Sequence, residues 1–249
     1  MTVLRSRDNP KVKRWLRLAG DSRYRRKERC ALIEGPHLLS ALLDRKLKPL
    51  AVLVMEELVT GSEVQGLLER AGVSPTALSK RIFSLIADTE APQGIAAEIA
   101  IPEGTADPRM DSVFLEGVQD PGNVGAILRS AAAFGIGSVY LDRNCADPWS
   151  PKVLRAAAGA HFSLALLEGH PDSGRLVCTV ARGGTALKNA DLSGPLCWVF
   201  GAEGKGVSRD VLRKAALRIT IPIIPEIESL NVAAAAAICL HHARIGRQE

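Results

Sequence analysis

The chain turns from a short apolar run into a helix at DPGNVGAILRSAAAFG, residues 120–135. The run Val-Phe-Leu at 113–115 is typical of a buried strand, and Asp-Pro-Gly at 120–122 is a cluster of residues that break regular structure. Asn123 follows this turn, and its side-chain oxygen can accept a hydrogen bond from a free N–H of a first helical turn. The sequence therefore predicts a strand, a tight turn and a helix with Asn123 as its N-cap.

The predicted helix carries Arg129, a charged residue, within an Ala- and Leu-rich interior. A rise of 1.5 Å per residue separates Asn123 from Arg129 by about 9 Å, so both side chains can face one pocket near the start of the helix. The plainer interpretation is a capped helix with a solvated arginine. This segment alone favours the plainer interpretation, and the other segments of the C-terminal half shift the balance toward a functional site.

Composition limits the class of protein. A chain of 249 residues, 47% of them apolar, can form two modest domains or one large one. It has no run of eighteen apolar residues, and residues 1–11 are too polar for a signal peptide. Its five cysteines lack the C-x-x-C spacing of zinc sites. We therefore expect a cytoplasmic protein with reduced cysteines, no metal site and no membrane segment.

Positive charge is concentrated at the N-terminus. Residues 1–30 carry a net charge of +8, so the other 219 residues sum to −3 within a total of +5. A local excess of this kind predicts contact with a polyanion, although a solvated helix surface is the alternative. Tyr24 stands among these charges, where it can stack on a base or pack in a core. The predicted RNA-binding cations are Lys11, Lys13, Arg14, Arg23, Arg25, Arg26 and Lys27.

The N-terminal part alternates between strands and helices. Asn9 and Pro10 mark a helix start. Strands are predicted at 31–33, 50–55 and 94–100, and helices at 37–43, 62–71 and 79–87. This alternation indicates a small α/β domain over residues 1–104. Residues 101–108, rich in Pro, Gly and Asp, form the predicted linker to a second domain at 109–249.

The second domain is predicted to be a parallel-sheet domain. Strands are expected at 113–115, 138–141, 162–167, 196–200 and 217–221, and helices at 151–158, 175–181, 209–215 and 231–244. The helix at 175–181 has the weakest pattern. The strands are continuously apolar, as in a parallel sheet that is covered on both faces. Ligands of such sheets bind beyond the carboxyl ends of the strands.

Unusual loops follow three of these strands. The first is the turn at 120–123; the second is FGAEGKGVS at 200–208, and the third is IPIIPEIESLNV at 221–232. The second loop lacks the spacing of phosphate-binding and dinucleotide-binding motifs. Glycine-flanked loops with Val199, Ile221 and Leu230 as apolar walls suit an adenine held by main-chain hydrogen bonds. The polar side chains at the rim of this predicted pocket are Asn123, Arg129, Glu203, Ser229 and Asn231.

The three loop segments resemble, in order and spacing, the three motifs of the SpoU family of RNA ribose 2′-O-methyltransferases. The resemblance covers about residues 111–245. It implies an α/β fold whose C-terminal parallel-sheet domain contains a deep trefoil knot, the SPOUT or α/β knot, and a homodimer that forms through the knot region. It also implies S-adenosyl-L-methionine as the methyl donor. The N-terminal part resembles, less closely, the small α/β RNA-binding domains of many members, which are related in shape to ribosomal proteins.

The resemblance also assigns residues. Asn123 and Arg129 match the catalytic pair of the first motif, Glu203 the acid of the second motif, and Ser229 and Asn231 the polar pair of the third. The cofactor contacts of the family, largely main-chain, fall on Gly201, Ile221 and Leu230. The sequence departs from the family at 155–160, where RAAAGA lacks the serine that relatives often have.

The implied reaction is methyl transfer to a ribose 2′-hydroxyl of RNA. The full N-terminal domain and its basic leader favour large-subunit ribosomal RNA over transfer RNA. We expect Arg129 to orient the hydroxyl and stabilise the developing alkoxide; a role as base requires an RNA phosphate that takes up the proton. Asn123 is expected to position these groups, and Glu203 either contacts substrate or holds its loop. The alternatives are a noncatalytic RNA-binding protein of the ribosome and a methyltransferase that acts on a base or a small molecule.

Overall fold

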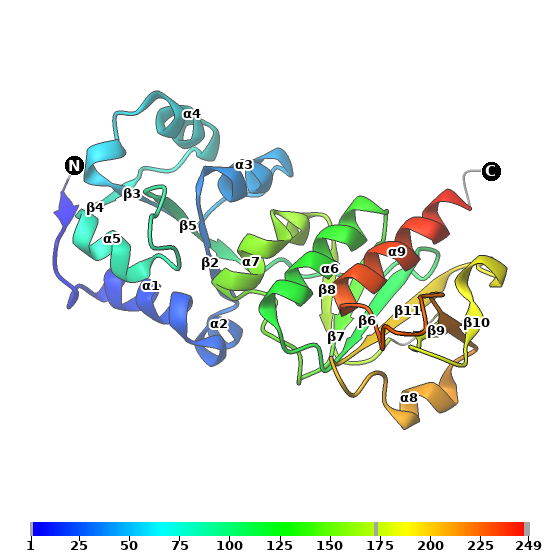
Figure 1. The fold of residues 1–249 in the computed structure, drawn as a ribbon. Coiled ribbons are helices and arrows are strands. Elements are labelled where there is room, and N and C mark those ends of the chain that lie inside the picture. Colours follow the sequence, from blue (N-terminus) through cyan, green and yellow to red (C-terminus); the bar gives the residue numbers. More distant parts are fainter. Residues whose placement is uncertain (1, 172–173, 247–249) are drawn as a thin grey trace. The chain divides into compact units, whose positions relative to one another are not determined.

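The computed structural model describes residues 2–171 and 174–246 (Figure 1). Their contacts divide the chain into two compact units: Met1–Pro102 with Asp147–Phe162, and Glu103–Ala146 with Ser163–Glu249. The break after Pro102 lies within the predicted linker, whereas the segment 147–162 belongs to the N-terminal unit although its place in the chain put it in the predicted second domain. The order of elements along the chain does not predict this placement of 147–162, because the segment contacts residues that are far away from it in the sequence.

The N-terminal unit contains a mixed sheet in the strand order β1-β4-β3-β5-β2. Strand β5 runs antiparallel to β2 and β3, and the other pairs are parallel. The strands are β1 (Val3–Leu4), β2 (Cys30–Glu34), β3 (Ala51–Met55), β4 (Thr76–Leu78) and β5 (Ile95–Ala100). The helices of this unit are α1 (Pro10–Gly20), α2 (Ser22–Glu28), α3 (Pro36–Asp44), α4 (Ser62–Ala71), α5 (Lys80–Ile86) and α7 (Pro151–Ala157), with the short 3-10 helices η1 (Glu56–Leu58) and η2 (Ala160–Phe162).

Helix α1 anchors the basic leader to the core of this unit. Its predicted start is confirmed: Asn9 accepts a hydrogen bond from the Lys11 N–H at 2.9 Å, and the helix begins at Pro10. The apolar residues Val12, Trp15 and Leu18 recur at helical spacing and are buried. Helix α2 was not predicted, because its residues after the cap Asp21 are almost all charged and carry no apolar periodicity.

The C-terminal unit contains a parallel sheet in the order β10-β12-β9-β11-β6-β7-β8, which confirms the predicted class. The strands are β6 (Ser112–Glu116), β7 (Ser138–Leu141), β8 (Ala165–Glu168), β9 (Arg175–Thr179), β10 (Thr185–Ala186), β11 (Leu196–Gly201) and β12 (Leu217–Thr220). The helices are α6 (Pro121–Ala133), α8 (Arg209–Lys214) and α9 (Val232–Ile245), with the 3-10 helix η3 (Leu187–Asn189). Figure 1 shows α6 beside α9, and α8 apart from them.

Two predictions in this unit are wrong. Residues 175–179 form a strand in the middle of the sheet, not a helix, because the short apolar run is buried between β11 and β12. Helix α6 begins at Pro121, and Asp120 is its N-cap, with the Asp120 Oδ1 accepting a hydrogen bond from the Asn123 N–H at 2.8 Å. Asn123 is therefore a residue of the first helical turn rather than the cap, which leaves its side-chain amide free to bind elsewhere.

The thiols of Cys30, Cys145, Cys178, Cys197 and Cys239 are all free. Burial raises the pKa of Cys178 and of Cys239 to about 12, so both thiols are neutral. Their environment is that of apolar core residues rather than of nucleophiles. Within residues 2–171 and 174–246, no helix has the length and the apolar character that a bilayer-spanning segment needs.

Candidate active site

Asn123 joins two loops that lie far away from it in the sequence. Its Nδ2 donates a hydrogen bond to Oε1 of Glu203, and its Oδ1 accepts one from Nδ2 of Asn231 at 3.0 Å. Glu203 lies 80 positions and Asn231 108 positions further along the chain. The structure thus brings together one predicted residue from each of the three loop segments.

The capping of helix α9 by Asn231 determines which atoms donate and which accept in these hydrogen bonds. Asn231 caps α9, and its Oδ1 accepts hydrogen bonds from the N–H groups of Ala233 at 2.9 Å and Ala234 at 3.2 Å. Because this oxygen already serves the helix, the amide nitrogen of Asn231 must donate to Asn123. The oxygen of Asn123 therefore accepts, and its nitrogen donates to the carboxylate of Glu203.

A cavity of about 640 Å³ lies beside this chain of hydrogen bonds, within the size range of small-molecule sites. It opens where β9, β11 and β12 end, as expected for a parallel sheet. Every predicted cofactor contact lines it, and so do three of the predicted rim residues. Those residues are Gly201, Ile221, Leu230, Glu203, Ser229 and Asn231.

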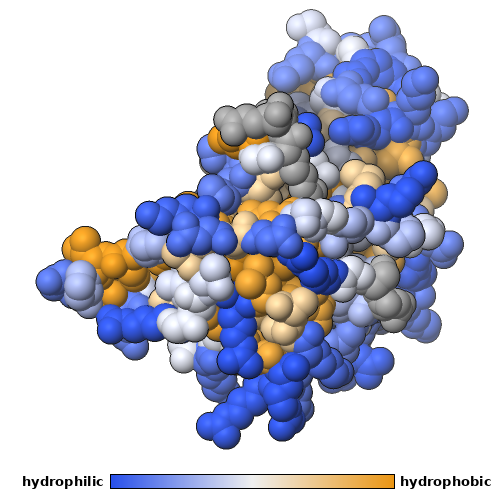
Figure 2. All heavy atoms as spheres, turned by 90° about the vertical axis from the view of Figure 1, so that its right-hand side faces the viewer, coloured by the Kyte–Doolittle hydropathy of each residue, from blue (hydrophilic) through white to orange (hydrophobic). Residues whose placement is uncertain are grey.

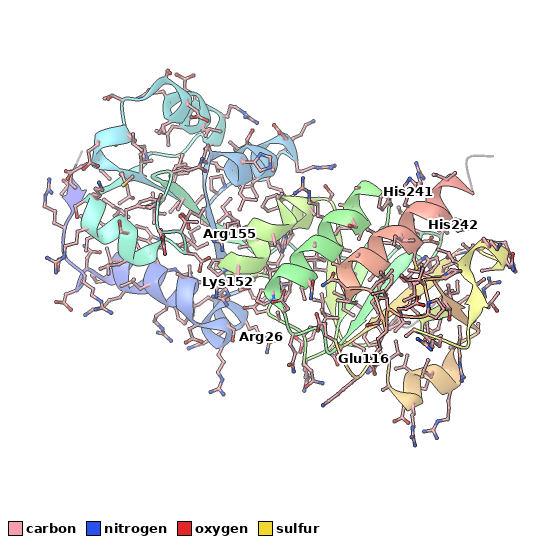
Figure 3. All side chains as sticks on the ribbon, viewed as in Figure 1. Arg26, Glu116, Lys152, Arg155, His241 and His242 are labelled. Atoms are coloured by element: carbon pink, nitrogen blue, oxygen red, sulfur yellow. The ribbon has the colours of Figure 1, made fainter. Side chains whose placement is uncertain are left out.

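Glycines shape the loop that borders the cavity. A Cβ on Gly201 would lie 2.2 Å from the backbone of Gly206, because the loop folds back and Gly206 donates its N–H to the Ala202 carbonyl at 2.8 Å. Gly204 and Gly206 have φ values of +80° and +67°, which favour glycine. The loop ends at Ser208, whose N–H donates to Glu116 Oε2 at 2.7 Å. Glu116 at the end of β6, labelled in Figure 3, thereby fixes the far end of the loop.

The cavity fits a methyl donor that carries an adenosyl group and a positive charge. Ile219, Ile221 and Leu230 supply apolar wall for an aromatic base, and the glycine loop supplies uncovered main-chain groups. Glu203 and Glu228 place two carboxylates on the same cavity against one cation, Lys205, and this excess of negative charge favours a positively charged ligand. The residues present thus suit S-adenosyl-L-methionine.

Two predicted residues, Arg129 and Val199, and the histidine pair of α9 lie outside the cavity lining. Arg129 is an exposed residue of α6 without a hydrogen bond or ion pair to the described part of the chain. Val199 is fully buried in the core and is not a cavity wall, which corrects that prediction. His241 and His242 are exposed on α9 (Figure 3), and the ring of His241 packs edge-on against Phe134 at 5.4 Å between centroids.

The sequence missed one wall of the cavity. Thr179, Val180 and Ala181 line it from the end of β9. They were assigned to the predicted helix at 175–181, and the end of such a helix would not have lain at the carboxyl edge of the sheet, where the cavity is. The signal that could have found them is the shortness of the apolar run between Gly174 and the glycine pair at 183–184, since runs of that length favour strands.

The C-terminal geometry agrees with the comparison to known families. The SpoU rRNA Methylase family matches residues 111–241. The chain belongs to this family. An MRM3-like substrate binding domain matches residues 9–97, within the N-terminal unit of this SpoU methylase.

Relatives of this SpoU methylase include whole-length matches. The 23S rRNA (guanosine(2553)-2′-O)-methyltransferase RlmP of Bacillus subtilis is 32% identical over 98% of this chain and 100% of its own length. The 23S rRNA (guanosine-2′-O-)-methyltransferase RlmB of Coxiella burnetii is 29% identical over 87% of this chain and 96% of its own. A crystal structure of an AdoMet-bound rRNA methyltransferase from Sinorhizobium meliloti superposes with a TM-score of 0.85 at 25% identity, covering 98% of both chains. The predicted family, enzyme class, methyl donor and α/β fold are thereby confirmed.

The basic leader of the SpoU methylase is only partly a free surface. Arg25 is buried: its Nε and Nη2 donate to Asp147 Oδ2 at 2.8 and 2.6 Å, and its Nη1 donates to the Leu18 carbonyl at 2.6 Å. The prediction of Arg25 as an RNA contact is therefore wrong. Arg14 donates to Glu98 at 2.8 Å and to Glu28 at 2.5 Å, and these carboxylates raise its pKa, so it too is engaged within the unit.

The other predicted RNA-binding cations are exposed: Lys11, Lys13, Arg23, Arg26 and Lys27. Lys13 pairs with Asp8 at 3.0 Å on the surface. Tyr24 is half-buried against the core, and the guanidinium of Arg17 lies 3.7 Å from its ring centroid. These contacts favour packing over base stacking as the role of Tyr24.

Proposed function

We propose that this protein transfers a methyl group from S-adenosyl-L-methionine to a ribose 2′-hydroxyl of 23S ribosomal RNA in the cytoplasm. The observation that carries the proposal is the convergence of Asn123, Glu203 and Asn231 beside the cavity of a SpoU methylase domain. Ribosomal RNA is favoured over transfer RNA because two relatives that match most of the chain, RlmP and RlmB, are named for 2′-O-methylation of 23S rRNA.

The reaction needs little from the protein beyond placement. Bound S-adenosyl-L-methionine supplies an electrophilic methyl group. The chain must align the 2′-oxygen with this methyl group, so that the oxygen–carbon bond forms as the sulfur–carbon bond breaks and the hydroxyl proton passes to solvent water. Arg129 is the residue that we assign to the hydroxyl, since a guanidinium stays protonated and can stabilise the developing negative charge. If Arg129 acts instead as the base, an adjacent RNA phosphate takes up the proton.

Asn123, Glu203 and Asn231 have the role of aligning the loops on which substrate and cofactor sit. The Glu203 carboxylate accepts a hydrogen bond from Asn123, which favours a loop-holding role over direct substrate contact. Ser229 is exposed at the cavity and is available for a polar contact. Gly201, Ile221 and Leu230 are assigned main-chain contacts to the cofactor.

A homodimer through the C-terminal domain is part of the proposal, with the third-motif loop threaded as in the trefoil knot of the family. Figure 2 shows an apolar patch with hydrophilic borders on the face that lies to the right in Figure 1. Exposed apolar side chains of this unit include Ile224, Ile227, Leu230 and Ile238. Ile224, at 63% exposure, is in the loop at 221–231 that also lines the cavity, so a second copy on this surface would cover the site's own loop.

The test combines cofactor binding with location of the methyl group. We expect calorimetric binding of S-adenosyl-L-methionine, and methylation of unmodified 23S rRNA transcripts at one nucleotide where the adjacent phosphodiester resists nuclease. Cofactor binding without methylation of 23S or transfer RNA would favour the noncatalytic protein. A methyl group on a base, or faster turnover of transfer RNA, would overturn the assigned substrate.

A further inference from the structure

The segment 147–162 is attached to the basic leader by a buried ion pair. The side chains of Arg25 and Asp147 are 5% and 13% exposed, and Arg25 Nη2 lies 2.6 Å from Asp147 Oδ2. The other carboxylate oxygen of Asp147 accepts a hydrogen bond from the Trp149 N–H at 3.0 Å. One carboxylate thus connects α2 with the turn from which α7 begins.

The same segment is held internally by a neutral histidine. His161 is buried, its Nε2 lies 2.6 Å from the Pro148 carbonyl oxygen, and its ring lies 4.9 Å from the Trp149 ring between centroids. Burial lowers the pKa of His161 to about 4, so the ring is neutral near pH 7 and Nε2 is the donor to the carbonyl. The start of α7 is therefore a well-packed part of the N-terminal unit.

These contacts leave uncommitted cations on neighbouring helices. Arg26, the residue after the buried Arg25, is exposed on α2, and Lys152 is exposed in the first turn of α7. Neither has an ion-pair partner among the residues that the structure describes. One turn further along α7, Arg155 pairs with Asp88. Figure 3 labels Arg26, Lys152 and Arg155 on these two helices of the unit.

We propose that Lys152 and Arg26 together form a phosphate-binding surface for the RNA substrate. The segment 147–162, which lies within the SpoU methylase match, then contributes to the RNA surface of the N-terminal unit. Lysine and arginine side chains that are exposed and unpaired can bind backbone phosphates without breaking an internal ion pair. Because Asp147 and Asp88 already serve Arg25 and Arg155, they do not neutralise this surface. The inference rests on the proposed function.

The experiment measures binding of in vitro transcribed 23S rRNA at several salt concentrations for Lys152→Gln, Lys152→Arg and the matched control Lys48→Gln. Lys48 is exposed in the same unit and has no described partner. We expect Lys152→Gln to weaken binding several-fold and to lower the log–log salt slope by about 0.7–0.9, the contribution of one phosphate contact. Lys152→Arg should retain the wild-type slope, and Lys48→Gln should match wild type.

Adding Arg26→Gln to Lys152→Gln should lower the slope by about 1.4–1.8 in total if both residues bind phosphates. An unchanged slope for Lys152→Gln, or an equal loss for Lys48→Gln, overturns this surface while 23S rRNA methylation by the wild-type protein still stands. Wild-type protein that binds S-adenosyl-L-methionine but neither binds nor methylates the transcript overturns the proposed function itself. If an acidic peptide binds the wild-type protein but not Lys152→Gln, while the transcript binds both proteins equally, the surface belongs to a protein partner and the RNA assignment is wrong.

Discussion

The side-chain amide of Asn123 makes one hydrogen bond through its nitrogen and one through its oxygen, and both depend on the orientation of the amide. Its nitrogen serves Glu203 and its oxygen serves Asn231, so a carboxylate at this position can satisfy only one of the two neighbours. The side chain is available for this task because Asp120 caps α6 in its place. A residue of the first helical turn thus acts on loops rather than on its own helix.

Asn123→Asp tests this role at the site. The new carboxylate would face that of Glu203, so we expect affinity for S-adenosyl-L-methionine to fall by about tenfold, corresponding to about 1.4 kcal/mol. Calorimetry measures the affinity. The double variant Asn123→Asp with Glu203→Gln should recover most of it, because the repulsion is then removed. Equal affinity of Asn123→Asp and wild type would contradict the positioning role.

Arg129→Ala tests the residue assigned to the ribose hydroxyl. Loss of a charge that stabilises the developing alkoxide should lower single-turnover methylation by a factor on the order of 10² or more. Cofactor affinity should not change, since Arg129 is outside the cavity lining. Arg129→Lys should recover little of the rate, because an ammonium lacks the planar fork of donors. Wild-type rates for the Ala variant would remove Arg129 from the mechanism.

His161 should make stability depend on pH. Its pKa is about 4 in the folded protein and about 6.5 in an unfolded chain, so below pH 6.5 the unfolded chain binds a proton that the folded one does not. The free energy of unfolding should therefore fall by up to about 2 kcal/mol from pH 7 to pH 5. Urea unfolding at both pH values checks this. His161→Gln should show a smaller drop, and an equal drop in both proteins would contradict the assignment.

At the scale of elements, the pair of Arg25 and Asp147 joins α2 to the turn before α7, although 122 positions separate the two residues. Helix α7 follows β7 in the chain, yet it packs on β2 of the N-terminal unit. An apolar pattern gives the helix its buried face but does not say which sheet covers that face. A buried ion pair beside the start of α7 accompanies this packing on β2.

Asp147→Ala measures what this pair contributes. It would leave the Arg25 guanidinium buried and uncompensated, and we expect a loss of about 3–5 kcal/mol in the free energy of unfolding. Chemical denaturation followed by tryptophan fluorescence reports it, since Trp15 and Trp149 are buried in this unit. Asp210→Ala breaks the exposed pair with Arg213 and should cost less than about 1 kcal/mol. Similar losses in both variants would mean that the buried pair contributes no more to the free energy of unfolding than an exposed pair does.

At the scale of the whole molecule, the C-terminal unit exposes several large apolar side chains. Ile238 is 42% exposed on α9, and Ile224 and Ile227 are exposed on the loop before that helix. Isolated exposed apolar residues are ordinary, but a group of them beside a ligand cavity indicates an interface. The expected occupant is a second copy of the chain.

Ile238→Asp tests the dimer. A buried, unpaired carboxylate at the interface should turn the dimer into a monomer at micromolar concentration, which light scattering after gel filtration measures. Leu85→Asp is the control, because Leu85 is similarly exposed, at 46%, in the N-terminal unit. A wild-type protein that is monomeric at high concentration would rule out the proposed dimer.

Much of this protein follows from the sequence, because strands and helices depend on local periodicity and on caps that neighbouring residues supply. The parallel sheet, the start of α1 at Pro10 and the cap of α9 at Asn231 are of this kind. Helix α2 was missed because its residues are mostly charged and show no apolar periodicity. Strand β9 was missed because its short apolar run is compatible with either a helix or a strand.

Only the tertiary structure decided which distant groups meet. The sequence placed Asn123, Glu203 and Asn231 at the rim of one pocket, and the structure showed which of them bond to one another. It also buried Arg25 against Asp147 and assigned 147–162 to the N-terminal unit. The sequence determined the residue types and the elements that carry them, since these depend on near neighbours. Contacts between distant residues depend on how the helices and strands pack against one another, and no local sequence pattern encodes that packing.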